Sequence, residues 1–342
     1  MLISINRVQN NNNYNSPMPQ SPHGIKNTKR QQLSAYLGRW QEKIFSLLRH
    51  RFYAQKSKGE ALLGISTHGD LLVASLCIQR APNQFELCYC EHLDSSLKEE
   101  FSSLHTLPPQ KIALALDDEL CFSKTLTFET HPNQSQIKNA LIDYLTNLKL
   151  HLNEEINFDY QIYKKNKKQY LLICAATTEK INTYLNSFKI NIEAVHSLEP
   201  KSHAVERFFH INYPEFSDEV FLFIHIQSHH VSSYLFSDSN IISNHTPPPN
   251  NEKISDEHQL DSIKEKIRHI LHENKNINRV LLSSNESTQK AIQHFILNNF
   301  ELDVLIVNPF KQIPISPNLN IMKIKKRAHL LIHSLGLSLK TS

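Results

Sequence analysis

The stretch FLFIHIQSHHVSSYLF, residues 221–236, decides the fold because it contains two apolar runs separated by a short polar segment. Each run has the length of a strand that is buried on both faces. The polar residues at the centre of the stretch are His225, Gln227, Ser228, His229 and His230. The stretch therefore predicts an antiparallel hairpin whose turn holds imidazole, amide and hydroxyl groups in place of glycine or a carboxylate.

Glycine is scarce throughout the chain. The six glycines are Gly24, Gly38, Gly59, Gly64, Gly69 and Gly336. Loops that wrap phosphate use glycine because the backbone must adopt positive φ and approach the ligand without a Cβ atom in the way. Any phosphate-binding turn between residues 70 and 335 would have to form without glycine.

Length and composition indicate a soluble protein of roughly two domains of about 150 residues each. Of the 342 residues 40% are hydrophobic, and the mean hydropathy is -0.40. The sequence shows no uninterrupted apolar run of the ~20 residues that span a bilayer, and residues 1–30 lack the apolar core of a signal peptide. We therefore expect a cytoplasmic protein. The net charge of +4 is mild, and no basic and aromatic repeat predicts nucleic-acid binding.

The composition divides the chain into four regions. Residues 1–30 are rich in Asn, Pro and Ser, which predicts a disordered tail. Residues 31–58 predict a basic amphipathic helix, which would contact an anionic membrane surface or pack against the protein body or a partner. We expect a first domain at 59–215 and a second at 216–342.

The order of expected strands and helices indicates an α/β protein. Each domain begins with an apolar strand, a short turn and a returning strand, first at ALLGISTHGDLLVASLCIQ and again at residues 221–236. This repetition predicts a duplicated architecture. Helices are expected at 134–150, 179–188, 201–209, 256–273, 287–300 and 327–339, and strands include 111–116 and 122–128.

Several of these segments, taken in order, resemble PilM, the actin-like cytoplasmic protein family of type IV pilus assembly, and more distantly the actin, Hsp70 and FtsA superfamily. The matching segments are ALLGISTHGDLLVASL, KIALALDDEL, NEEINFDYQIY, LLICAAT, VLIVNPF and SLGLSLK. The resemblance implies an actin-like two-domain fold with duplicated mixed sheets flanked by helices. It also implies a peptide-binding subdomain within residues 111–209 and a C-terminal helix that returns to the first domain.

The resemblance further implies three nucleotide-binding loops, and this chain departs from the family in each. Its first loop keeps Gly64 and Gly69 but has Ser66 and His68 where the family has an acidic residue and a glycine. Its second loop has His225, Gln227 and Ser228, and its adenosine-facing loop has Ser283, Ser284 and Asn285. A missing carboxylate removes the group that orients Mg²⁺ through its waters, and each added Cβ fills phosphate space.

We therefore interpret these loops as vestigial and expect no catalytic residues, no bound metal and no required cofactor. Weak binding of ATP with Mg²⁺ stays open, since serines and Asn285 can donate hydrogen bonds. A zinc site formed by Glu86, Cys88, Cys90 and His92, which alternate along one expected strand, lacks a clear fourth ligand. The histidines of the 221–236 turn are attributed to composition bias, because the whole chain has 20 histidines.

The sequence thus predicts a non-catalytic scaffold at the cytoplasmic face of the inner membrane, serving type IV pilus assembly or related DNA uptake or secretion. The resemblance implies that it binds the cytoplasmic N-terminus of a PilN-like inner-membrane protein in a groove between subdomains of the first domain. The alternative is an active actin-like ATPase whose nucleotide binding regulates assembly. A third interpretation is a host-directed effector with an Asn-rich tail.

Overall fold

The computed structural model describes residues 62–68, 71–94, 111–152, 154–165, 168–187, 195–227, 230–237, 241–246, 256–274 and 276–340. The tail and the basic helix expected at 1–30 and 31–58 lie outside these residues, as do Gly69, Ser228 and His229. No helix within the described ranges combines the length and the apolar character needed to cross a membrane.

The first sheet has five strands in the order β3-β2-β1-β4-β8. Strands β1 (Leu62–His68), β2 (Leu71–Ala81) and β3 (Gln84–Asp94) form an antiparallel meander, and β4 (Lys111–Leu116) and β8 (Val195–Pro200) continue the sheet parallel to β1. Both faces of this sheet are covered, which is why β1 and β4 are apolar along most of their length.

The second sheet repeats this arrangement in the order β11-β10-β9-β12-β13. Strands β9 (Phe221–Gln227) and β10 (His230–Phe236) are the hairpin predicted from residues 221–236, with Gln227 paired to His230. Strand β11 (Ile241–Thr246) pairs antiparallel to β10, and β12 (Arg279–Ser283) and β13 (Asp303–Ile306) run parallel to β9. The predicted duplication and α/β fold class are therefore confirmed.

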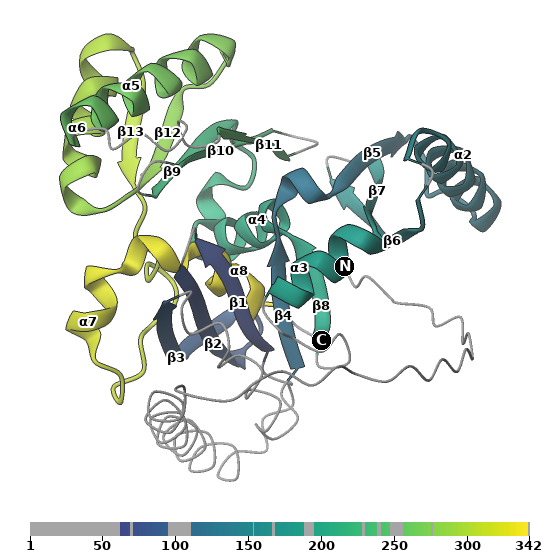
Figure 1. The fold of residues 1–342 in the computed structure, drawn as a ribbon, viewed down its shortest axis with the longest axis horizontal. Coiled ribbons are helices and arrows are strands. Elements are labelled where there is room, and N and C mark those ends of the chain that lie inside the picture. The colour runs from purple at the N-terminus through teal and green to yellow at the C-terminus, as the bar shows by residue number, and fades with distance from the viewer. Residues whose placement is uncertain are drawn as a thin grey trace, which may run out of the picture.

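Helices fill three layers around the two sheets (Figure 1). Helix α3 (Thr178–Ser187) packs against the outer face of the first sheet, whereas α5 (Asp256–Glu273) and α6 (Glu286–Asn299) cover the outer face of the second. Helices α4 (Lys201–Asn212) and α8 (Ile332–Ser338) lie between the sheets, in one apolar core with residues from both.

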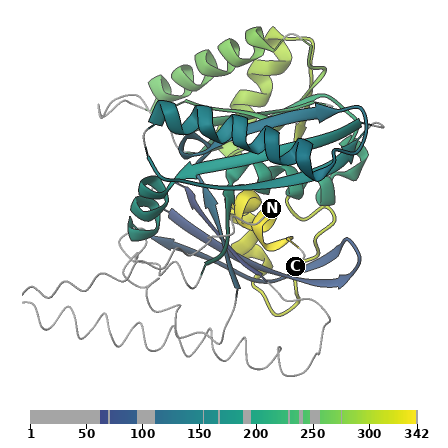
Figure 2. The same ribbon diagram turned by 90° about the vertical axis from the view of Figure 1, so that its right-hand side faces the viewer.

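A small subdomain is inserted between β4 and β8, after a 3-10 turn at Asp118–Leu120. It consists of β5 (Phe122–Phe128), α2 (Gln134–Leu152), β6 (Ile156–Lys165) and β7 (Lys168–Thr177), with the antiparallel strand order β5-β7-β6. Figure 1 shows this sheet and its helix extending from the body of the protein, and Figure 2 shows them face on. The second half has only α6 between the corresponding strands β12 and β13.

Two glycines allow α8 to approach its neighbours closely. A Cβ atom at Gly64 of β1 would lie 2.2 Å from the backbone oxygen of Ser334, and one at Gly336 would lie 1.9 Å from the backbone oxygen of Ala204 in α4. Helix α8 is thus held between β1 and α4 at positions where only glycine fits. Gly64, assigned to a nucleotide loop by resemblance, makes this packing contact.

A buried ion network links the end of β8 to the C-terminal segment. Glu199 is 1% exposed, and the Arg207 guanidinium donates to its two carboxylate oxygens at 2.6 and 3.0 Å. Lys340 Nζ donates to the same carboxylate at 3.0 Å, and Arg207 also donates to the Gly336 backbone oxygen at 2.8 Å. Burial alone would raise the pKa of Glu199, but the charge and hydrogen bonds of Arg207, with Lys340, lower it to about 2.

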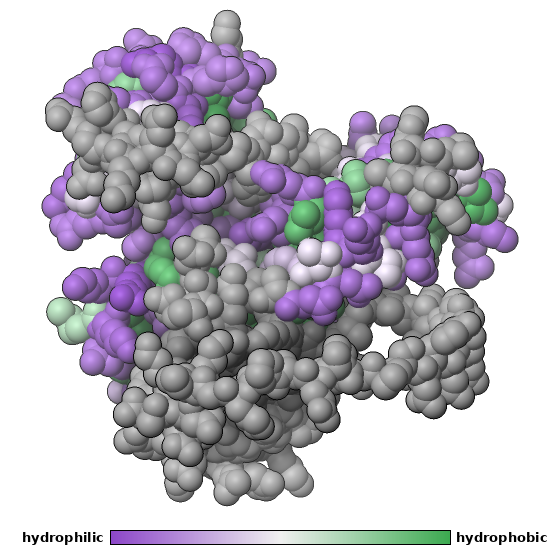
Figure 3. Space-filling model, viewed as in Figure 1, coloured by the Kyte–Doolittle hydropathy of each residue, from purple (hydrophilic) through white to green (hydrophobic). Residues whose placement is uncertain are grey.

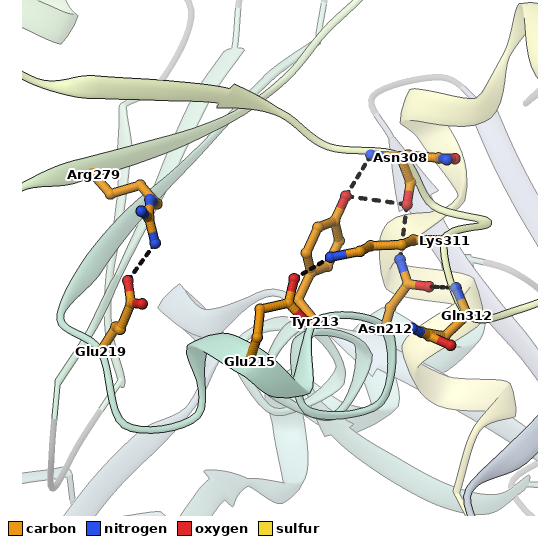
Figure 4. Close-up of polar contacts among 8 residues, drawn as sticks. All are labelled: Asn212, Tyr213, Glu215, Glu219, Arg279, Asn308, Lys311 and Gln312. Atoms are coloured by element: carbon orange, nitrogen blue, oxygen red, sulfur yellow. Dashed lines mark hydrogen bonds and ion pairs between the residues drawn. The ribbon is translucent and has the colours of Figure 1, made fainter.

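The NPF turn of the second half, residues 308–310, is hydrogen-bonded to residues at the end of α4 (Figure 4). The Asn212 amide donates to the backbone oxygen of Asn308 at 2.8 Å and accepts from the Gln312 backbone N–H at 2.7 Å, while Asn308 N–H donates to the Tyr213 hydroxyl at 2.6 Å. Two ion pairs flank these bonds, Lys311 with Glu215 and Arg279 with Glu219. The turn therefore fixes the two halves to each other.

The C-terminal region differs from the expected single helix at 327–339. It contains α7 (Ile321–Lys326), a 3-10 helix at Ala328–Leu331 and then α8. The break falls at Arg327, whose backbone leaves the helical region. Strand β11 was also not predicted; its polar residues Ser243, Asn244 and His245 suggest a loop in isolation, whereas the open edge of β10 makes them a strand.

Candidate functional site

The ends of β1 and β9 meet where the two halves of the protein join. Alternation along each strand places Ser66 and His68 of β1, and His225 and Gln227 of β9, on the faces that point between the sheets. The Nδ1 atom of His68 lies 2.7 Å from Oε1 of Gln227, which joins one half to the other, and the Ser66 hydroxyl lies 3.1 Å from His68 Nε2.

Helix α8 contributes a third imidazole, His333. The ring centroids lie 5.6 Å apart for His68 and His225, 5.0 Å for His68 and His333, and 5.2 Å for His225 and His333. The three residues are exposed by only 4%, 3% and 2%, respectively. We call His68, His225 and His333 the histidine cluster.

Polar neighbours orient the histidine cluster. The Tyr234 hydroxyl of β10 lies 2.9 Å from Nε2 of His333, and the His225 ring stacks on Phe223 with centroids 6.0 Å apart. Burial lowers the pKa of His68 well below 6.5, and the charges of His225, Lys201 and His329 lower it further, against a smaller raising effect of the Gln227 hydrogen bond. His68 is therefore neutral at pH 7.

The third loop, Ser283 to Asn285, lies beside β9. Its residues pair with β9 and cap α6. Ser283 pairs with His225 across β12 and β9, and Ser284 Oγ is buried without a hydrogen bond. The Asn285 side chain caps α6, accepting from the Thr288 backbone N–H at 3.0 Å and from the Ser287 hydroxyl at 2.9 Å. The amide oxygen is thus engaged within its own segment.

The residues present do not fit a Mg-ATP site of the actin-like kind. Among the described residues 64–68, 225–227 and 283–285 there is no carboxylate to orient Mg²⁺. The position expected to be a phosphate-binding glycine carries His68, whose ring is buried against two other imidazoles. Buried imidazoles from β1, β9 and α8 lie side by side at this junction.

The suggested zinc ligands of β3 do not share one face. The pairing of β2 with β3 shifts between Leu76 and Cys77, so Cys88 is an extra residue in the ladder. The expected alternation of Cys88 and Cys90 along one buried face is therefore wrong. Cys90 packs against the core between the sheets, as Leu87 does, while Tyr89 packs against the outer core and Cys88 donates to the Glu86 backbone oxygen.

A second candidate site is an apolar groove in the inserted subdomain, between α2 and β6. It has a volume of about 600 Å³. Three of its hydrophobic side chains are well exposed: Ile142 by 50%, Phe158 by 39% and Tyr160 by 42%. Figure 3 shows hydrophobic surface among hydrophilic residues on the right, where α2 lies in Figure 1. The lining residues are Gln134, Ile137, Lys138, Leu141, Ile142, Leu145, Thr146, Phe158 and Tyr160.

Sequence reasoning found part of the site at the junction. It selected Ser66, His68, His225 and Gln227, which the structure brings together, but not His333 or Tyr234. The signal for His333 is weak, one of two imidazoles within the apolar segment HLLIHSLGL. The peptide groove was expected between subdomains of the first domain, whereas the α2–β6 groove lies within the inserted subdomain, and none of its residues was named.

Comparison with known proteins supports the fold. No protein-family model matches the sequence, and a comparison with curated protein sequences found no match. Among solved structures, the chain is similar to one of a PilM-PilN type IV pilus biogenesis complex, with a TM-score of 0.63, 13% identity, and coverage of 83% of this chain and 98% of that chain.

Two further structures are more distant. A Bacteroides thetaiotaomicron protein with an actin-like ATPase fold has a TM-score of 0.44, 11% identity, and coverage of 73% of this chain and 92% of that chain. The cytoplasmic domain of EpsL, an inner-membrane component of the type II secretion system of Vibrio cholerae, has a TM-score of 0.41, 8% identity, and coverage of 80% and 95%.

The repeated strand order and the helices between the sheets define an actin-like α/β fold. Within that class, the structural likeness to the chain of the PilM-PilN complex extends over most of both chains. The PilM resemblance inferred from the sequence is therefore confirmed for the fold.

Proposed function

We propose that this chain is a non-catalytic adaptor that holds an extended peptide from an inner-membrane partner during assembly of a type IV pilus or a related DNA-uptake or secretion machine. The α2–β6 groove is the observation that carries this proposal. It is apolar and accessible, and it belongs to a subdomain that the second half of the protein lacks.

The groove has two features that suit an extended peptide. Strand β6 is at the edge of its sheet, so its outer edge can supply backbone hydrogen bonds to an added strand. Phe158 and Tyr160 on β6 and Ile142 on α2 offer apolar surface to alternate side chains of that strand. Exposed hydrophobic side chains concentrated around one groove are typical of an interaction site.

The partner class comes from the structural similarity. PilN accompanies PilM in the complex to which this chain is similar, and we propose a PilN-like inner-membrane protein that binds through its cytoplasmic N-terminus. The adaptor would then be a cytoplasmic protein held at the inner membrane by this partner. Residues 31–58 would add contact with anionic lipid, which stays a prediction from their sequence.

The filled junction between the halves supports the non-catalytic part of the proposal. The described loop residues offer no carboxylate for Mg²⁺, and the histidine cluster is buried. An ATPase would need these side chains to leave the cleft before each nucleotide could enter. We therefore propose that peptide binding is independent of ATP.

Calorimetric titration of the full chain tests both parts. The titrant is a synthetic peptide with the sequence of the cytoplasmic N-terminus of the PilN-like protein from the same genome, with and without Mg-ATP. We expect a micromolar Kd that Mg-ATP leaves unchanged within twofold. Binding only in the presence of Mg-ATP would refute nucleotide independence, and absence of peptide binding under both conditions would refute the adaptor.

A matched pair of variants tests the groove. Ile142→Asp places a charge in the groove, whereas Leu297→Asp places one on α6, and the two parent side chains are 50% and 52% exposed. We expect Ile142→Asp to weaken peptide binding at least tenfold, because a carboxylate must then be desolvated against apolar side chains. Leu297→Asp should leave the Kd unchanged; equal Kd values for both variants would place the peptide elsewhere.

A further inference from the structure

We propose that His68, His225 and His333 form a binding site for a divalent metal ion of the Zn²⁺ type, which joins the two halves of the protein. This inference is independent of the adaptor proposal. The three imidazoles come from β1, β9 and α8, segments far apart in the sequence, and one ligand atom from each lies within 4.8 Å of the others.

The cluster requires only small movements to reach coordination geometry. Tetrahedral zinc holds imidazole nitrogens at ~2.0–2.1 Å, which places the nitrogens roughly 3.3 Å from one another. The ligand atoms here lie no more than 4.8 Å apart. Ring rotations about the side-chain bonds, with the strands in place, can bring the three nitrogens together.

Neighbouring side chains hold two of the rings in the orientation that ligands require. The Gln227 amide oxygen accepts from Nδ1–H of His68, which leaves the Nε2 lone pair for the metal in place of its contact with Ser66. The Tyr234 hydroxyl engages Nε2 of His333, so the metal would take Nδ1. A ligand histidine whose other nitrogen bonds to a protein oxygen is the usual arrangement in zinc sites.

Three imidazoles leave the fourth position of a tetrahedral zinc ion open. Burying a doubly charged ion is energetically costly when none of its protein ligands is a carboxylate. A bound water, whose pKa falls to about 7 on zinc, can lose a proton and halve the charge. The Ser66 hydroxyl is placed to hydrogen-bond to that water once it is released from His68.

The proposed role is structural. The metal would connect β1 of the first half, β9 of the second half and α8 through residues of this chain alone. The bound ion would hold α8 against both sheets and restrict their relative motion.

The test uses the full chain, stripped with EDTA and dialysed, and titrated with CoCl2 and then ZnCl2. We expect one equivalent of Co²⁺ to give the visible ligand-field bands of a four-coordinate ion, and Zn²⁺ to displace it and raise Tm. His333→Gln should weaken Zn²⁺ binding by at least about 100-fold, because it removes a ligand. His294→Gln, on the exposed face of α6, should bind as the wild type does.

Two controls separate a specific site from general binding to a histidine-rich chain. Tyr234→Phe keeps all three ligands and should weaken Zn²⁺ affinity about tenfold, since it removes the hydroxyl that orients His333. Circular dichroism establishes that each variant is folded. The proposal is overturned if folded wild type gives no four-coordinate cobalt spectrum, or if His333→Gln and His294→Gln bind Zn²⁺ with equal affinity.

Discussion

The junction between the two halves buries its side chains, whereas the α2–β6 groove leaves several of its hydrophobic side chains exposed. At the junction, His68, His225 and His333 are turned inward and almost fully buried. In the groove, Ile142 and Phe158 remain 50% and 39% exposed. A side chain that is buried already has its contacts within the protein, whereas an exposed apolar side chain gains them only when a partner arrives.

This difference indicates which part of the fold can present an open surface. Strands β1 and β9 are covered on both faces, which fixes the place where their ends meet. The inserted subdomain contributes little to that core. It can therefore present an open surface without loss of the central fold.

The largest expected effect concerns the position of α8, which carries His333 into the junction. Gly336→Ala should destabilise the protein by more than about 4 kcal/mol, because the added Cβ would lie 1.9 Å from the Ala204 backbone oxygen. In an exposed helix the same change stabilises by about 1 kcal/mol. Urea denaturation of the full chain measures the difference, with Leu297→Ala on α6 as control. A loss below 1 kcal/mol would mean that α8 is not tightly held.

The buried ion network should have the next largest effect. Glu199→Gln leaves Arg207 and Lys340 buried without their carboxylate and should cost about 3 kcal/mol. The folded pKa of Glu199 is about 2, below the ordinary value of 4.5, so its contribution is present above pH 4.5 and is lost as pH falls toward 2. The control is Glu286→Gln, whose pair with Lys290 is exposed to solvent and should leave the free energy of unfolding almost unchanged.

The pH response of the histidine cluster should be smaller. Burial and the neighbouring charges of His225, Lys201 and His329 lower the folded pKa of His68, so the unfolded chain binds a proton that the folded chain excludes. The contribution of neutral His68 to the free energy of unfolding is therefore fully present above about pH 6.5. It is lost as the pH falls below that value, by up to ~1.4 kcal/mol per pH unit.

The pH dependence of stability should differ between the metal-free wild type and His68→Gln in this pH range. Denaturation midpoints between pH 7.5 and 5.5 should fall less steeply for His68→Gln, with His294→Gln as the control for a change of histidine alone. Parallel curves for wild type and His68→Gln would show that the His68 ring reaches solvent, contrary to a filled junction.

The sequence predicted those features that depend on local pattern. The α5 bounds and the β9–β10 hairpin follow from apolar periodicity within each segment, and Ser66, His68, His225 and Gln227 follow from the resemblance. The meeting of His333 with the two strand ends depends on how α8 crosses between the sheets, which no local pattern encodes. Likewise, the close contact at Gly64 became visible only with α8 beside it.

The smallest expected effect on stability lies in the groove. Phe158→Ser removes an aromatic side chain from a position that is 39% exposed, and Ile142→Ser does the same at 50%. Each should change the free energy of unfolding by about 1 kcal/mol, because a large fraction of each side chain is already exposed and only the contacts of the remainder are lost. Urea denaturation of both variants, without peptide, checks this value.

The double variant Phe158→Ser with Ile142→Ser gives a sharper test of the open groove. If the two side chains do not support each other in the unbound protein, their effects on stability should add within about 0.5 kcal/mol. A loss well above the sum would mean that α2 and β6 close on each other in solution and that the groove is part of the core. With stability unchanged, loss of peptide affinity in the same variant would be attributable to the missing contacts with the partner.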